Sequence, residues 1–348
     1  MTATASAART RRATVIATVA LVIAVVAALS IGPARLPIWA VMREVLDRLP
    51  LLNLDSGLSV NQVATVWDLR FPRVVLGLLV GAVLSGSGAA YQGAFRNPLA
   101  DPYLLGVAAG AGLGATIALV AGVTTDNGGV LTPVPLAAFG GAMSSVALTY
   151  LAGGVGRQRT ATGLLLAGVA VSSFLTAAQT YVLQRNTQVL RTVYSWILGR
   201  LTVVGWTDVG IVLPYAVASA VVLLVMARSL DVLAVGDEEA SALGIRVKRV
   251  RAIVIVAASL GTAAAVAVSG LIGFVGLIVP HTVRLMVGGS YRRIIPLSQI
   301  GGAAFLVAAD LLARTVISPA ELPIGVITAI VGGPFFLLVM RTRREDFA

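Results

Sequence analysis

Cysteine is absent from the 348-residue chain, and only 12% of the residues are charged. The missing thiols exclude disulfide bonds, thiolate metal sites and cysteine catalysis. The low charge content excludes an ordinary soluble domain, in which about 25% of residues are charged. Hydrophobic residues make up 57% of the chain, and the mean hydropathy is +0.93. The sequence therefore predicts a membrane protein.

Lysine and histidine are also scarce, with a single copy of each. A P-loop needs Gly-Lys-Ser/Thr, and Lys248 stands between a valine and an arginine, so the chain does not bind ATP in that way. His281 has no cysteine or second histidine as co-ligand and is interpreted as a cap or hydrogen-bond donor rather than a substrate ligand. Paired acids at membrane depth are missing as well. The sequence predicts no enzyme, no metal site and no cofactor.

Apolar segments of about 20 residues, the length that crosses a bilayer as a helix, recur along the chain. They lie at 13–31, 72–95, 103–123, 131–155, 161–183, 207–227, 251–269, 271–288, 294–317 and 323–340. The first is too long for the apolar region of a signal peptide. The expected domain is therefore one transmembrane unit, 1–348, with a membrane core at 13–341.

The basic residues form short clusters between the apolar segments, so the net charge of +11 indicates topology rather than nucleic-acid binding. Ten crossings place both termini on one side of the membrane. Both termini carry arginines, namely Arg9, Arg11, Arg12, Arg341, Arg343 and Arg344. Because positive charge marks the cytoplasmic side, we expect a plasma-membrane protein with cytoplasmic termini.

The two halves of the sequence contain the same short pattern. Ser87-Gly88 precede Pro98 in the first half, and Ser269-Gly270 precede Pro280 in the second, with eleven positions from serine to proline in both. Such a pattern is typical of the inverted repeats of transporters. A chance match in a chain rich in glycine, alanine and valine is the alternative.

The longest segment on the expected cytoplasmic side, residues 228–250, is predicted to contain a short helix. Three acids at 237–239 begin it, and Gly244 suits its C-terminal cap. We interpret it as a docking element for a partner that supplies energy. A solvated acidic loop is the alternative.

Charge within the apolar segments is limited, and Asp310 with Arg314 is the main example. Their spacing indicates a local i,i+4 ion pair near the outer end of a span. An ion-coupled secondary transporter is expected to carry acids or broken helices at mid-depth. It remains the alternative function of a different class.

Five motifs occur in order along the chain, and together they resemble one family. They are Leu69-Arg-Phe-Pro-Arg73, residues 92–102, Gly236 to Gly244, residues 270–281 and Ala320-Glu-Leu-Pro-Ile-Gly325. The chain resembles, over residues 14–341, the FecCD-type permease subunits of ABC importers for ferric siderophores, haem and cobalamin. The resemblance implies an all-α, polytopic membrane protein of about ten transmembrane helices with an inverted internal repeat, the type II importer fold.

The resemblance also implies a function and partners. The cargo is expected to be an iron complex, either a ferric siderophore or haem, with cobalamin as the alternative. The expected partners are a second copy of the chain, a cytoplasmic ABC ATPase dimer that hydrolyses ATP, an extracytoplasmic substrate-binding lipoprotein and membrane lipid, but no nucleic acid.

Site residues follow from the same resemblance. Arg70 and Arg314 match outward arginines that pair with glutamates of the binding protein, and a plain interfacial anchor is the alternative for Arg70. The segment 231–245 matches the coupling helices, although Glu239 stands where the signature has alanine. The expected coupling residues are Asp237, Glu238, Glu239, Ala240 and Gly244. The candidates for lining the pathway are Pro102, Gly106, Gly110, Gly168 and Ser172.

Overall fold

The computed structural model of the chain describes residues 3–32, 34, 36–48, 55–122, 133–154, 160–201 and 205–342, and within them it is helical without a strand. Seven of the described helices are long and apolar enough to cross a membrane, and three shorter ones are also apolar. The long helices are α1 (Ala3–Ser30), α4 (Phe71–Phe95), α6 (Pro133–Ala152), α7 (Ala161–Arg185), α9 (Thr207–Leu233), α11 (Val247–Ser269) and α13 (Tyr291–Thr315). The shorter ones are α5 (Val107–Val120), α12 (Val275–Val287) and α14 (Ile324–Thr342).

These ten helices confirm the all-α polytopic fold expected from the sequence. Short helices connect them, namely α2 (Ile38–Asp47), α3 (Val60–Ala64), the π-helix η1 (Thr65–Arg70), η2 (Thr187–Val189), α8 (Leu190–Ile197) and α10 (Asp237–Ala242). Arg343 and Arg344, and the ends of the spans expected at 103–123 and 131–155, lie outside the described residues.

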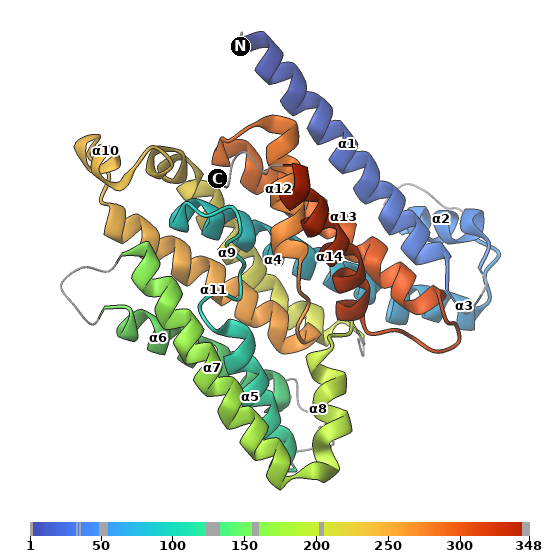
Figure 1. Cartoon of the computed structure of the whole chain (residues 1–348). Helices are drawn as coiled ribbons and strands as arrows, with labels where there is room; N and C mark the ends of the chain where they lie inside the picture. The colour runs from blue at the N-terminus through green and yellow to red at the C-terminus, as the bar shows by residue number, and fades with distance from the viewer. Residues whose placement is uncertain are drawn as a thin grey trace.

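The helices pack around a centre formed by α4, α11 and α13, whose apolar windows are mostly buried, whereas α1, α7 and α9 are largely exposed. In Figure 1, α10 and the start of α1 lie toward the top of the view. The helices α2 and α3 lie at the other end of α1 (Figure 1). We call these two ends of the bundle the α10 end and the α2 end.

Glycine permits the central helices to approach one another closely. A Cβ atom at Gly81 of α4 would stand 2.3 Å from the carbonyl oxygen of Gly302 on α13, and one at Gly88 would stand 2.0 Å from the carbonyl oxygen of Gly276 on α12. Small residues at such crossings are the usual device of membrane helices. They place the α4 backbone in direct contact with α12 and α13.

Two expected spans are shorter than the sequence predicted. Residues 103–106 form turns before α5, and residues 270–274 separate α11 from α12, so α5 has 14 residues and α12 has 13. Gly270 ends α11 with φ +68, and a Cβ there would stand 2.2 Å from the carbonyl oxygen of Trp196. At about 1.5 Å per residue, neither helix alone reaches across the roughly 30 Å hydrocarbon core.

The packing of the helices supports two related halves. In the first half α5 packs on α6 and α7, and in the second α12 packs on α13 and α14. Helix α4 contacts α12 and α13, and α11 contacts α5 and α6. The Ser-Gly and proline spacing does not mark equivalent positions, because Ser87 lies inside α4 whereas Ser269 ends α11.

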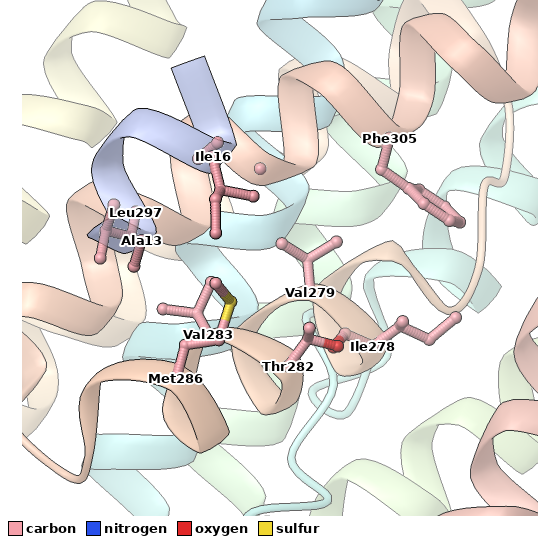
Figure 2. Close-up of a pocket in the computed structure, with 11 residues that line it drawn as sticks. Ala13, Ile16, Ile278, Val279, Thr282, Val283, Met286, Leu297 and Phe305 are labelled. Atoms are coloured by element: carbon pink, nitrogen blue, oxygen red, sulfur yellow. The ribbon is translucent and has the colours of Figure 1, made fainter. Parts of the chain in front are cut away.

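A groove of about 220 Å³ runs between α1, α12 and α13. Its lining is almost entirely apolar, as Figure 2 shows for Ala13, Ile16, Val279, Met286 and Phe305. The groove lies on the exposed side of the bundle, where α1 covers only part of the two helices beneath it.

Candidate functional site

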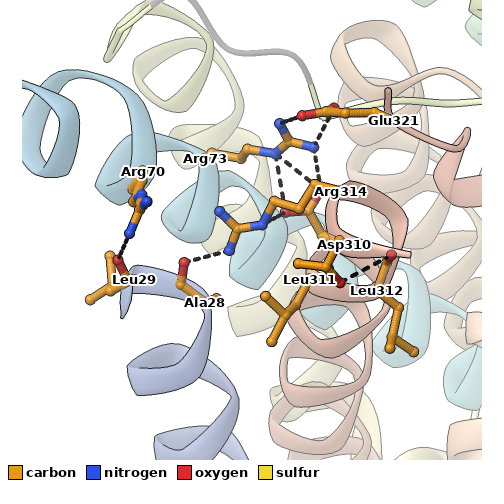
Figure 3. Close-up of polar contacts among 10 residues, drawn as sticks. Ala28, Leu29, Arg70, Arg73, Asp310, Leu311, Leu312, Arg314 and Glu321 are labelled. Atoms are coloured by element: carbon orange, nitrogen blue, oxygen red, sulfur yellow. Dashed lines mark hydrogen bonds and ion pairs between the residues drawn. The ribbon is translucent and has the colours of Figure 1, made fainter. Parts of the chain in front are cut away.

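At the α2 end, charged side chains from three elements meet in a buried cluster (Figure 3). Arg73 of α4 donates to both carboxylate oxygens of Asp310 on α13, with its closest contact at 2.8 Å, and to Glu321 before α14 at 2.9 Å. The side chain of Asp310 is 4% exposed and that of Glu321 is 39% exposed. A bidentate arginine offsets part of the cost of burying the Asp310 charge. The cluster therefore ties α4, α13 and the start of α14 together.

Arg70 and Arg314, the arginines predicted to dock the binding protein, are buried at this end, and their docking role stays a prediction. Arg70 donates to the carbonyl oxygens of Leu29 at 2.7 Å and Ser30 at 2.9 Å, and Arg314 donates to that of Ala28. These carbonyls belong to the last turn of α1. The carbonyl groups of a last turn have no hydrogen-bond donor within their own helix. Both cations also favour the negative end of the α1 dipole. Their positions give them a structural role within the chain.

The pair of Asp310 and Arg314 is present as the sequence predicted, with Nε and Oδ2 3.6 Å apart. The pairing of Asp310 with Arg73 was missed. Both side chains were expected near the same membrane edge, and that shared depth was the available signal for the contact.

At the α10 end, residues 237–242 form the short helix expected in the cytoplasmic segment. Gly244 has φ +84, and the amides of Gly244 and Ile245 donate to the carbonyls of Ser241 and Ala240. This is the Schellman arrangement that a glycine after a helix predicts. The acids at 237–239 occupy the first turn, where the helix dipole favours negative charge.

The surface of α10 combines acids with apolar side chains. Glu238 and Glu239 are exposed, and Val235 and Leu243 beside them are 66% and 69% exposed. Ala240 points inward and is fully buried, and its predicted role in coupling stays a prediction. Its small side chain seats α10 on Leu233 and Val247.

Asp237 attaches α10 to the core of the bundle. Its carboxylate accepts from Arg251 of α11 at 3.1 Å and pairs with Arg96 after α4 at 3.4 Å. Arg251 is buried and also donates to the carbonyl oxygen of Ala94 at 2.9 Å. The helix therefore connects to the ends of α4 and α11 through one carboxylate. Neither arginine was predicted as a site residue.

Four of the five pathway candidates do not line an open surface. Pro102, Gly106, Gly110 and Gly168 are buried. A Cβ at Gly110 would stand 2.2 Å from a carbonyl oxygen of α6, and one at Gly168 would stand 2.1 Å from the carbonyl oxygen of Leu104. These glycines permit close backbone packing, and their place in a pathway wall stays a prediction. Ser172 is half-buried and stays a prediction.

A different face of α7 is exposed. It carries polar residues at helical spacing, namely Ser173, Thr176 and Thr180, beside Phe174, which is 71% exposed, and Tyr181, which is 64% exposed. Polar side chains along a membrane helix are typical of a protein contact or a wet surface rather than of a lipid contact. The spacing of these residues in the sequence was the signal that could have identified this face.

His281 lies inside α12, buried, with its ring edge-on to that of Phe335 at 6.1 Å between centroids. The ring therefore packs against α14. Its predicted role as a cap or hydrogen-bond donor stays a prediction.

Within the described residues the chain is a bundle of ten apolar helices, and the short helix α10 with its exposed acids lies at one end of it. The family model of the FecCD transport family matches residues 20–342, and the chain belongs to this family, the permeases of ABC importers.

The chain is similar to curated relatives and to a solved structure. It is 44% identical to the cobalamin import system permease protein of Halobacterium salinarum, over 83% of this chain and 77% of the relative. It is 37% identical to the hemin transport system permease protein of Yersinia pestis, over 81% and 84%. A structure described as an inward-facing metal-chelate type ABC transporter matches with a TM-score of 0.80 at 28% identity, covering 94% of this chain and 97% of the other.

Proposed function

We propose that this permease imports an iron complex, either a ferric siderophore or haem. The family and the likeness to a metal-chelate type transporter and a hemin permease carry the proposal. The likeness to a cobalamin permease favours cobalamin as the second candidate. All three cargoes are bulky chelates. A wide path between helices suits such a cargo better than a tight binding site does.

The α10 end is proposed to contact the cytoplasmic ABC ATPase dimer. The exposed acids of α10 and the flanking Val235 and Leu243 supply charge and apolar area on one small surface. A protein interface uses an apolar centre with a polar rim in this way. The described start of α1 lies toward this end, which we assign to the cytoplasm (Figure 1).

A second copy of the chain is proposed to contact the exposed polar face of α7. A single chain offers one wall of a path, because Ser173, Thr176 and Thr180 lie on its outer surface rather than around an internal channel. Two copies that face one another through α7 would enclose a path lined by hydroxyl groups.

The α2 end is proposed to receive the substrate-binding lipoprotein. Glu321 is the exposed member of the charged cluster, and Arg73 beneath it is 15% exposed. Arg70 and Arg314 then support the docking surface from below by holding the end of α1.

The proposal is tested by transport in proteoliposomes that contain the permease, its ATPase and its binding protein. Uptake of radiolabelled ferric siderophore or haem that requires ATP supports it. Competition by unlabelled cobalamin with higher affinity would assign the cobalamin function instead. Accumulation by the permease alone on an ion gradient would contradict the importer and support a secondary transporter.

A further inference from the structure

The groove between α1, α12 and α13 combines an apolar body with a basic mouth. Its body is lined by apolar and small side chains, among them Ala13, Ile16, Met286, Leu297 and Phe305 (Figure 2). Residues four apart on a helix lie one above the other. This rule identifies the side chains that stand over each wall of the groove.

Three arginines stand one turn beyond the lining residues. On α1, Arg9 precedes Ala13 by four positions and Arg12 precedes Ile16 by four. On α13, Arg293 begins a row that continues every four residues through Leu297, Gly301 and Phe305, all of which line the groove. The guanidinium groups therefore continue the groove walls toward the α10 end.

A contact between the two helices places these arginines at one level. Arg293 donates to the hydroxyl of Thr10 at 3.4 Å, which joins the start of α1 to the start of α13. Arg9 and Arg12 are exposed, and Arg293 is half-buried. The mouth of the groove thus carries three positive charges within about one helical turn of the apolar wall.

We propose that this groove binds an acidic glycerophospholipid, with its phosphate at Arg9, Arg12 and Arg293 and an acyl chain along the groove. The arrangement matches the two parts of such a lipid, because charge lies at the membrane surface and apolar wall lies below it. A second copy of the chain is disfavoured as the occupant, since a symmetric contact through this face would bring like charges together. The site does not depend on the cargo and adds a lipid ligand to the transport function.

The test compares lipid retention by the purified full-length chain in native mass spectrometry. The probes are phosphatidylglycerol and phosphatidylcholine with identical oleoyl chains. Each arginine near an anionic headgroup contributes about fivefold in affinity. Arg12→Gln should weaken phosphatidylglycerol binding about fivefold, and the double variant Arg9→Gln/Arg12→Gln should weaken it about 25-fold. Both variants should change phosphatidylcholine binding little.

Arg11→Gln is the matched control for the mouth. Arg11 lies on the same helix at the same depth, but its row leads to Val15 and Val19, which are exposed and do not line the groove. This variant should change phosphatidylglycerol binding less than twofold. An equal loss in Arg11→Gln and Arg12→Gln would show a general surface effect and overturn the site.

Filling the body of the groove tests the acyl chain independently. Ala17 lines the groove, and Ala17→Leu should lower the retention of both lipids. Ala220→Leu fills a groove between α4 and α9 and serves as the control. Unchanged lipid retention in Ala17→Leu, or displacement of the lipid by inorganic phosphate, would contradict the proposal. Loss of a dimer in Ala17→Leu without loss of lipid would assign the groove to a second copy and overturn it.

Discussion

Asp237→Asn tests whether α10 is attached to the bundle through Arg251. The side chain of Asp237 is 41% exposed, and the side chain of its partner Arg251 is 5% exposed. Solvent screens such a pair, so the substitution should cost about 1 kcal/mol or less of stability. It should nevertheless loosen α10, because both described ion pairs of the helix use this one carboxylate.

Arg251→Met should cost more than Asp237→Asn. It removes the pair and also leaves the buried carbonyl oxygen of Ala94 without its donor, which costs about 1 to 3 kcal/mol. Because the two side chains contact each other, the loss of stability in the double variant should be smaller than the sum of the two single losses. The measurement is denaturation of the purified chain in detergent.

The functional assay is the number of ATP molecules hydrolysed per substrate imported by the reconstituted complex. Asp237→Asn should raise this ratio while the assembled complex is retained. Glu238→Gln is the matched control for stability, since it removes the same charge from the same turn at an exposed position. Equal stability losses for Asp237→Asn and Glu238→Gln, or additive losses in the double variant, would refute the attachment through Arg251.

Three further predictions follow from individual contacts. Gly81→Val should abolish folding, because a Cβ at this position would stand 2.3 Å from a carbonyl oxygen of α13. Gly140→Val is the control and should express normally, because a Cβ there meets nothing within 4 Å. The measurement is the yield of detergent-stable protein. Asp310→Asn should cost about 3 to 5 kcal/mol, because it removes the described carboxylate partner of the buried Arg314 and leaves Arg73 with Glu321 alone, but Glu321→Gln should cost only about 1 kcal/mol or less, measured by denaturation. Burial raises the pKa of Asp101 to about 6, so the native state binds this proton more tightly than the unfolded chain. Acidification from pH 7 to pH 5 should therefore stabilise the wild type relative to Asp101→Asn in thermal melts.

The positions of most helices could be predicted from the sequence, because a long apolar segment in a membrane has few alternatives to a helix. The span expected at 251–269 lies within α11, and that at 72–95 coincides with α4 to within one residue. The short α10 could also be predicted, since its acids and its glycine cap act within the helix itself.

The breaks before α5 and α12 could not be predicted from hydropathy. Residues 103–106 and 270–274 are apolar or small, as the adjoining helices are. Hydropathy reports removal from water and does not distinguish a helix from an irregular segment that is buried in protein. Gly270 follows the last residue of α11 and lies close to the backbone of Trp196. This contact depends on the packed structure and cannot be read from hydropathy.

The charged cluster at the α2 end was only partly predictable for the same reason. A pair four residues apart, such as Asp310 and Arg314, follows from helix geometry. The contact between Arg73 and Asp310 joins residues 237 positions apart and requires the α4 and α13 crossing. The burial of Arg70 likewise depends on where α1 ends, because its partners are the last carbonyls of that helix.

Helix α4 connects the two ends of the bundle physically. Its first turn carries Arg73, which holds α13 and Glu321, and its last turn carries the Ala94 carbonyl that holds Arg251. Its 25 residues span about 38 Å as a helix, and its one proline, Pro72, lies in the first turn, directly after the π-helix η1. Its glycines also fix it against α12 and α13. A displacement of α10 relative to α11 therefore acts first on the bonds at the end of α4, and the same rigid helix carries the cluster at the opposite end.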